Sequence, residues 1–273
     1  MISSNPTVDN EAAGLSSWPN RSRFPGLAAR AKAAAVSASA TAFVAACASA
    51  LVFLVWYPSP FREISGGLDL LAIVVGADLV LGPLITFCVF DRRKARPELL
   101  RDMLIVVTMQ LAGLAYGLHA LYIARPAALA LERDRVRVVR AADLDEQAMA
   151  RAPAGLRHVP LWGQLIVAAV DDPADNLRSV QLAMAGLDIG QRPERWVPPE
   201  QTAELWLEGS RPIVQLLRRY PNRKAGLEAA IAATRLPMEQ VRYLPLLARR
   251  TDWIVLIDAG NGKIVGYAQF DGF

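Results

Sequence analysis

Hydrophobic residues form three long runs in the first half of this chain and short alternating patterns in the second half. The runs cover residues 33–57, 66–90 and 103–124. Each is long enough to cross a bilayer, which takes about 20 mostly apolar residues. The pattern therefore predicts three transmembrane helices within residues 31–124, followed by a water-soluble domain in residues 125–273.

The segment before the first run is polar. Residues 1–30 are rich in Ser, Asn and Pro and end in basic residues, so we expect a disordered, basic cytoplasmic tail. Ala48 and Ala50 flank Ser49 in a pattern that a signal peptidase could cleave. The most hydrophobic residues of the run, however, follow this point, where a signal peptide would already have become polar. We therefore favour an uncleaved membrane helix.

The second run carries unusual residues near its centre. Asp78 lies in the middle of residues 66–90, and Gly82 and Pro83 follow it by about one helical turn. A charged side chain at this depth costs about 2.5 kcal/mol or more, so it normally faces protein or water. Pro83 removes one backbone donor and is expected to bend the helix. These features predict the central helix of a bundle rather than a simple lipid anchor.

The third run carries residues that could contact Asp78. Counting about 1.5 Å per residue from the ends of both runs places Asp78 level with Gly113. We expect Gln110 and Tyr116 to be its hydrogen-bond partners, and Gly113 and Gly117 to allow close helix packing. A structural polar contact is the favoured interpretation of these binding or packing residues, and a proton or ion path is the alternative.

The first run contains small residues at a regular spacing. Ala34, Ala38, Ala42, Ala46 and Ala50 recur every four residues, with a second small row beside them. Small residues at this spacing let helices approach closely inside a membrane. We favour packing within the chain, and the alternative is a groove that receives a helix from another protein.

Basic residues near the runs predict the orientation of the chain. The segment before the first run and the loop 91–101 are both rich in Arg and Lys, whereas the loop 58–65 contains only Arg62. Short loops with more Lys and Arg normally stay in the cytoplasm. We therefore expect a multi-pass protein of the bacterial inner membrane, with a cytoplasmic amino terminus and a periplasmic carboxy-terminal domain.

The second half has the pattern of an α+β domain with an antiparallel sheet. A hairpin is expected around Asp134, a strand at residues 165–170, and three closing strands at residues 241–248, 252–258 and 263–270. A Gly-Asn-Gly turn joins the last two strands. Helices are expected to begin at the capping pair Asp143 and Glu146, at Asp172-Pro173, at Arg211 and at Asn222. The apolar face of the helix after Pro173 contains Leu177, Val180, Met184 and Leu187.

Composition and motifs argue against catalysis. The chain is 53% hydrophobic, and its net charge of +4 is divided between both halves, which does not favour nucleic acid as a partner. Cys47 and Cys88 lie within apolar runs and are expected to act as small hydrophobic residues. The soluble half contains one histidine, His158, and lacks hydrolase, phosphate-loop and zinc-protease spacings. We therefore predict no enzyme, cofactor, metal site or small-molecule substrate.

Several stretches, in the same order, resemble the TfpX/TfpZ family of type IV pilin accessory proteins. They are LVFLVWYPSPF, GADLVLGPLITFCVFD, QLAGLAYGLHALYIARPAALALERDRVRVVRAADL, APAGLRHVPLWG and LPLLARRTDWIVLIDAGNGKIVGY. The resemblance covers nearly all of the chain after Lys32, and the run from Gly76 to Pro83 is its most distinctive part. The polar tail before it is longer than is usual for the family.

This resemblance implies an inner-membrane, chaperone-like helper for type IV pilus biogenesis that binds a cognate pilin. It assigns no catalytic residue. The alternative is a membrane-anchored periplasmic sensor or ligand-binding module, although the amino-terminal tail is too short and polar for a cytoplasmic output domain. A membrane-embedded enzyme built on Asp78 and His119 would lack a second set of acidic or metal-binding residues.

Overall fold

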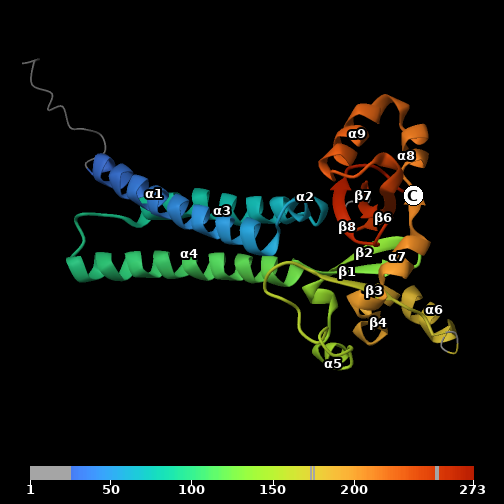
Figure 1. Ribbon diagram of the computed structural model, residues 1–273. Coiled ribbons are helices and arrows are strands. Elements are labelled where there is room, and N and C mark those ends of the chain that lie inside the picture. The colour runs from blue at the N-terminus through green and yellow to red at the C-terminus, as the bar shows by residue number, and fades with distance from the viewer. Residues whose placement is uncertain (1–25, 173, 175, 250–251) are drawn as a thin grey trace, which may run out of the picture.

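Three long helices project from a domain built around a β-sheet (Figure 1). The computed structural model describes residues 26–172, 174, 176–249 and 252–273. The long helices are α1 (Leu27–Leu51), which continues through a π-helical turn (Val52–Trp56), α3 (Gly67–Val89) and α4 (Arg96–Ala124). All three are long and apolar enough to cross a membrane. The prediction of three long apolar helices followed by an α+β domain is confirmed.

Two of these helices begin earlier than their apolar runs. α1 starts at Leu27, so Arg30 is helical, and α4 starts at Arg96. Proline in the first turn of α4 needs no backbone partner, and Glu98 in the same turn is favourable beside the helix amino terminus. Helix geometry therefore extends beyond the hydrophobic stretch. Residues 1–25 of the expected tail lie outside the described residues.

The helix bundle is closed at the end next to the sheet domain. α1 and α4 both pack on the central helix α3. Val52, Tyr57, Leu71 and Leu121 form a buried cluster at this end. The Tyr57 hydroxyl donates a hydrogen bond of 3.0 Å to the carbonyl oxygen of Leu121. These contacts bring the domain-proximal ends of all three helices together.

A short helix between the first two membrane helices belongs to the core of the soluble domain. It is α2 (Phe61–Ile64), and both of its terminal side chains are buried with Trp206, Trp253 and other residues of the sheet domain. The rings of Phe61 and Tyr267 meet edge to face, with centroids 5.3 Å apart. The sequence patterns did not predict this contact. It fixes the domain directly against the end of the bundle.

The sheet is mixed, with the strand order β4-β3-β1-β2-β6-β7-β8 and β5 paired to β6. The strands are β1 (Pro126–Glu132), β2 (Arg135–Arg140), β3 (Leu165–Ala169), β4 (Trp196–Val197), β5 (Arg211–Pro212), β6 (Val241–Leu247), β7 (Trp253–Asp258) and β8 (Ile264–Ala268). The expected hairpin, the closing strands and their tight turn are confirmed. The sheet is not purely antiparallel, however, because β1 pairs with β3 and β2 with β6 in parallel. Parallel strands need a long crossover connection, and helices lie in the chain between β1 and β3 and between β2 and β6.

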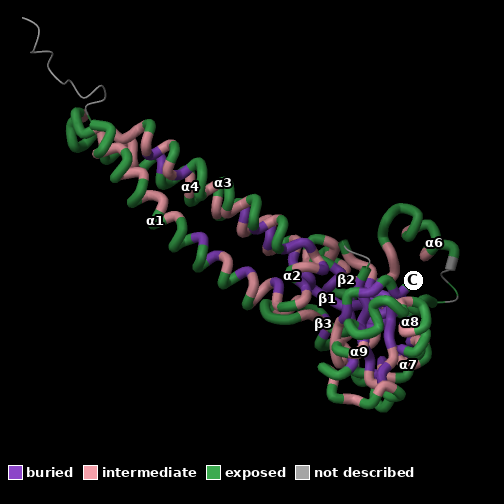
Figure 2. Tube along the Cα trace, turned by 90° about the horizontal axis from the view of Figure 1, so that it is seen from above, coloured by how far each residue is buried: buried purple, intermediate pink, exposed green. Residues whose placement is uncertain are grey.

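Side chains of β1 alternate between two hydrophobic layers. Ala128 and Ala130 pack with Met149, whereas Leu129 and Leu131 pack with α2 and Trp206. Successive residues of a strand point to opposite faces, so this strand is buried on both sides. Figure 2 shows that buried residues are concentrated in the sheet domain, while much of each long helix is exposed.

Further short helices lie around the sheet. They are α5 (Glu146–Ala150), α6 (Asn176–Met184), α7 (Ala203–Gly209), α8 (Val214–Arg219) and α9 (Lys224–Ala233). The apolar faces of α8 and α9 pack on β6, β7 and β8. The helix expected from Arg211 begins at Val214 instead, since Arg211 and Pro212 pair with β6.

Two other local predictions are corrected. Asp145, not Asp143, caps α5 by accepting a hydrogen bond from the Ala148 backbone, while Asp143 binds Arg140. The expected apolar face of α6 lies on one side of that helix but is not buried, with Leu177 82% and Met184 85% exposed. Pro173, at the expected start of this helix, lies outside the described residues.

Candidate functional site

A cavity of about 530 Å³ lies among the three long helices, in the half of the bundle that is remote from the sheet domain. α1 lines it with small and apolar side chains between Ala29 and Ala45, and α4 lines it between Met103 and Leu114. The central helix contributes Asp78. The cavity therefore combines an apolar wall with polar groups at membrane depth.

Small side chains on α1 make the contact with α3. The Thr86 hydroxyl lies 3.1 Å from the Ser37 hydroxyl and 2.9 Å from the Gly82 carbonyl oxygen. Ala45 and Ala48, further along α1, are also buried. The row from Ala34 to Ala50 lies to one side of this contact, and its last three members are exposed. The contact between α1 and α3 therefore uses the second row of small residues, which includes Ser37 and Ala45, and not the row from Ala34 to Ala50.

Two glycines allow α3 and α4 to approach each other. A Cβ atom at Gly82 would lie 2.2 Å from Gln110 Nε2, and one at Gly117 would lie 2.5 Å from Val74 Cγ1. At Gly117 the neighbour is a branched side chain close to its own backbone, so glycine is required there for this packing, whereas at Gly82 the flexible end of Gln110 could move aside. Gln110 Nε2 is buried and has no hydrogen-bond partner among the described residues.

Asp78 faces the cavity from the central helix. Gly113 on α4 lies opposite it, where an added Cβ atom would lie 3.8 Å from Asp78 Oδ1. The expected bond to Tyr116 is absent, because Tyr116 is 77% exposed and faces away from the bundle. Successive residues of an α-helix are rotated by about 100° around its axis. Gly117 faces α3, so the preceding residue, Tyr116, points away from it. No hydrogen bond to Asp78 is found within the described part of the chain.

Basic residues surround the remote end of the cavity. Lys32 and Arg92 line it, and Arg30 forms an ion pair of 3.2 Å with Asp91 in the loop after α3. The hydrogen bond from the Arg93 backbone and the pairing with Arg30 lower the pKa of Asp91 below its usual value. This carboxylate thus stays charged and holds the start of α1 against the loop.

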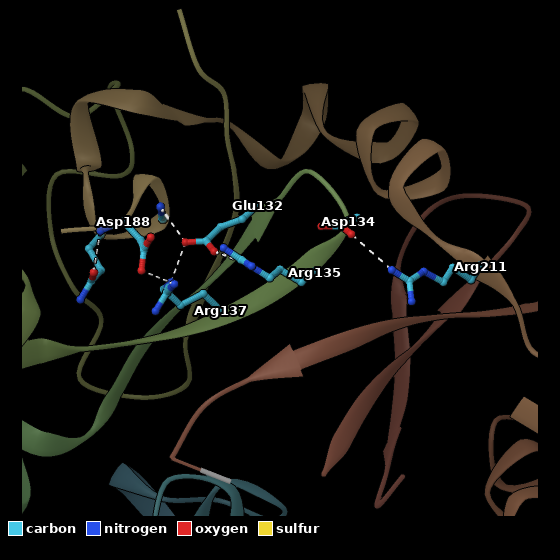
Figure 3. Close-up of polar contacts among 8 residues, drawn as sticks. Glu132, Asp134, Arg135, Arg137, Asp188 and Arg211 are labelled. Atoms are coloured by element: carbon cyan, nitrogen blue, oxygen red, sulfur yellow. Dashed lines mark hydrogen bonds and ion pairs between the residues drawn. The ribbon is translucent and has the colours of Figure 1, made fainter. Parts of the chain in front are cut away.

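A second polar cluster lies in the soluble domain, at the β1–β2 hairpin (Figure 3). Glu132, which is 4% exposed, accepts hydrogen bonds from Arg137 Nε at 2.6 Å, Arg135 Nε at 3.0 Å and the Gly190 backbone at 3.0 Å. Arg137 also binds Asp188. The carboxylate is therefore fully partnered by groups of its own chain, and the cluster stabilises the fold around the hairpin.

Ion pairs and buried rings support the same region. Arg211 reaches Asp134 at the hairpin turn over 3.2 Å (Figure 3). Burial opposes ionisation of Asp143, but bonds from Arg140 outweigh this effect and lower its pKa. Burial raises the pKa of Tyr267 to about 12. Within the described ranges, no group of three His, Cys, Asp or Glu side chains is placed to hold a metal ion.

Of the site residues named from the sequence, Asp78 and Gln110 line the membrane cavity, and none belongs to the hairpin cluster. Asp78, Gly82, Gln110 and Gly113 lie together where the three helices meet, and Tyr116 does not join them. Pro83 lies inside α3, beside Gly82. The alternating Arg residues of β2 did not predict an ion pair with Glu132, because no residue close to Glu132 in the sequence indicates that its side chain is buried.

Comparisons with known proteins agree on one family. The family model "Fimbrial assembly protein FimB" matches residues 25–66, which include α1 and α2. The fimbrial assembly protein of serogroup I from Dichelobacter nodosus is 30% identical over 84% of this chain and 91% of its own length. The serogroup E1 protein of the same organism is 31% identical over 85% of this chain and 91% of its own length. No solved structure matches. The chain belongs to the family of fimbrial assembly proteins.

Proposed function

We propose that this protein is an inner-membrane accessory protein for type IV pilus assembly, which binds a cognate pilin and stabilises it before assembly. The observation that carries this proposal is the similarity to fimbrial assembly proteins over most of both chains. The relatives are named for assembly rather than for catalysis. We assign no catalytic step, cofactor or small-molecule substrate to the protein.

The joined architecture supports such a role. A pilin that awaits assembly is a membrane-anchored subunit with a helix in the bilayer and a head outside it. Because α2 packs in the core of the sheet domain, the bundle and the domain form one unit that can contact both parts. A typical protein interface buries about 1,600 Å², which the sheet domain and the long helices can provide together.

Binding would stabilise the subunit by mass action. A partner that binds only the folded subunit contributes RT ln(1 + [L]/Kd), or about 2.7 kcal/mol at a hundred times Kd. Without this contribution a larger fraction of the subunit is unfolded and open to proteolysis. The protein would thus act as a chaperone that keeps assembly-competent pilin available.

The proposed orientation places the sheet domain in the periplasm. It rests on the basic residues of the loop after α3 and at the start of α1, which favour the cytoplasm. Alkaline phosphatase fused after Asp134 should be active, and the same reporter fused after Arg93 should be inactive. The reverse pattern would place the sheet domain in the cytoplasm and remove its contact with the pilin head.

Deletion of the gene tests the function itself. We expect fewer surface pili, reduced twitching and less pilin protein, with pilin transcript unchanged. Complementation with the intact gene should restore all three. Normal pilin abundance and normal piliation in the deletion strain would contradict the proposal.

A further inference from the structure

A second cavity, of about 570 Å³, lies where α4 meets the sheet domain. Tyr122 and Ile123 line it from the last turn of α4, and Arg157, His158 and Val159 line it from the loop that joins α5 to β3. In Figure 1 this loop turns back beside the end of α4. The cavity therefore connects the end of a membrane helix with a loop of the soluble domain.

The depth of this cavity in the bilayer follows from the charges along α4. No Lys, Arg, Asp or Glu occurs between Asp102 and Arg125, and this stretch measures about 33 Å at 1.5 Å per residue. The hydrocarbon core of a bilayer is about 30 Å thick. Trp56 and Tyr122, whose ring centroids are 5.3 Å apart, are of the residue types that gather at membrane–water interfaces. The cavity therefore lies at the level of the lipid headgroups.

The cavity adjoins the side of α4 that faces away from the bundle. Leu121 is buried in the cluster that closes the bundle. Ile123 follows it by two residues, which places its side chain about 200° further around the helix axis, and Ile123 is 40% exposed. A lipid molecule beside α4 is therefore adjacent to the cavity.

The charged groups of the cavity suit a phosphate. Two arginines and one carboxylate line it, namely Arg125, Arg157 and Glu146. Arg125 is occupied by the carbonyl oxygen and the ring of Tyr122. Arg157 is exposed and donates from Nε to the Ala152 carbonyl oxygen at 3.0 Å, and its two terminal nitrogens find no acceptor within the described ranges. Guanidinium groups bind phosphate oxygens strongly, so Arg157 can hold an anionic headgroup.

The same loop exposes two large apolar side chains close to the cavity. Leu161 is 59% exposed and Trp162 is 71% exposed. The other tryptophans that the structure describes in the sheet domain, Trp196, Trp206 and Trp253, are at most 8% exposed. Exposed tryptophan and leucine side chains beside basic residues are typical of segments that enter the interfacial region of a bilayer.

We propose that the loop between α5 and β3 is a membrane-surface anchor, in which Leu161 and Trp162 insert into the headgroup region of the adjacent leaflet and Arg157 binds the phosphate of an anionic phospholipid. The anchor acts without a pilin. It attaches the sheet domain to the membrane at a point outside the helix bundle, and this fixes the height of the domain above the bilayer.

Depth-dependent fluorescence quenching tests the anchor in the full chain. The sheet domain has no cysteine, so Trp162→Cys accepts a single label once Cys47 and Cys88 are replaced by alanine. The protein is reconstituted without pilin in vesicles of phosphatidylethanolamine and phosphatidylglycerol that carry a spin-labelled lipid. A label at position 162 should lose most of its fluorescence. Met184→Cys is the matched control and should lose little, because Met184 is 85% exposed and α6 lies at the end of the sheet domain remote from the bundle.

Every other result of this experiment contradicts the anchor. Weak quenching at both positions would place the loop in water. Equally strong quenching at both would show that the domain lies on the bilayer without a specific loop. If position 162 becomes protected from aqueous iodide only after purified pilin is added, the loop is a pilin contact instead. Circular dichroism of the labelled variants checks that each is folded.

Substitutions of Arg157 test the phosphate site. One basic residue at an anionic membrane surface corresponds to roughly a fivefold change in affinity. Quenching at position 162 by spin-labelled phosphatidylglycerol, relative to spin-labelled phosphatidylcholine, reports the local preference for an anionic lipid. Arg157→Gln should lower this preference by up to about fivefold, and Arg157→Lys should retain most of it. Arg151→Gln removes an exposed charge outside the cavity, and equal preferences for Arg157→Gln and Arg151→Gln would refute the site.

Discussion

Replacing Ile64 by alanine should destabilise the soluble domain, although residue 64 lies between two membrane helices. Its side chain is 0% exposed and packs in the same cluster as Leu246 and Trp253. Truncation of a buried isoleucine to alanine costs about 2–5 kcal/mol, because burial is lost and a cavity remains. The free energy of unfolding of an ordinary domain is about 5–15 kcal/mol. The substitution should therefore remove a large fraction of the free energy of unfolding of the sheet domain.

Urea unfolding of the detergent-solubilised protein measures this effect. Trp206 and Trp253 belong to the cluster around Ile64, so tryptophan fluorescence reports on the affected core. With a denaturant slope of about 2 kcal/mol per molar, the midpoint should fall by about 1–2.5 M. Ile73→Ala is the matched control, since Ile73 lies on α3 and is 70% exposed. Equal midpoints for the two variants would falsify the conclusion that α2 is part of the domain core.

Three further outcomes are expected. Gly117→Ala brings a Cβ atom to 2.5 Å from Val74, so it should lower bundle stability by about 1–3 kcal/mol, and Val74→Ala should partly restore the thermal midpoint. Burial raises the pKa of Tyr267 to about 12, so the folded state holds this proton more tightly than an unfolded chain, in which tyrosine titrates near pH 10. Stability should be constant below about pH 10 and fall towards pH 12, and Tyr267→Phe should reduce this fall in urea midpoints. Glu132→Gln breaks a buried ion pair and should cost about 3 kcal/mol in the same assay, whereas Asp134→Asn, at an exposed turn, should change little.

Hydropathy predicted the membrane helices because the lipid environment acts on each segment by itself. Twenty apolar residues in a row identify a span without knowledge of its neighbours. The closing strands were predictable for a similar reason, since period-two alternation and a Gly-Asn-Gly turn are local signals. Helix ends were less accurate, because α4 begins at Arg96, a charged residue that hydropathy places outside the apolar run.

Features that depend on distant contacts could not be read from local patterns. Phe61 is buried by Tyr267, far along the chain, and no nearby residue indicates this contact. The apolar face of α6 was recognised correctly, yet periodicity cannot say whether such a face meets a partner. Tyr116 shows the limit of depth counting, since the correct level in the membrane does not fix the direction in which a side chain points.

The position of α2 has a consequence for exchange of genetic material between related strains. The core of the sheet domain is assembled from two separate sections of the chain, one within residues 61–64 and one after Arg125. A crossover near residue 125 would join Phe61 and Ile64 from one parent to a core that had diversified in the other. Hybrids of this kind should pack poorly even when each parent is stable. Inheritance of functional variants is thus expected to favour the uninterrupted gene, or hybrids in which the α2 segment travels with the sheet domain.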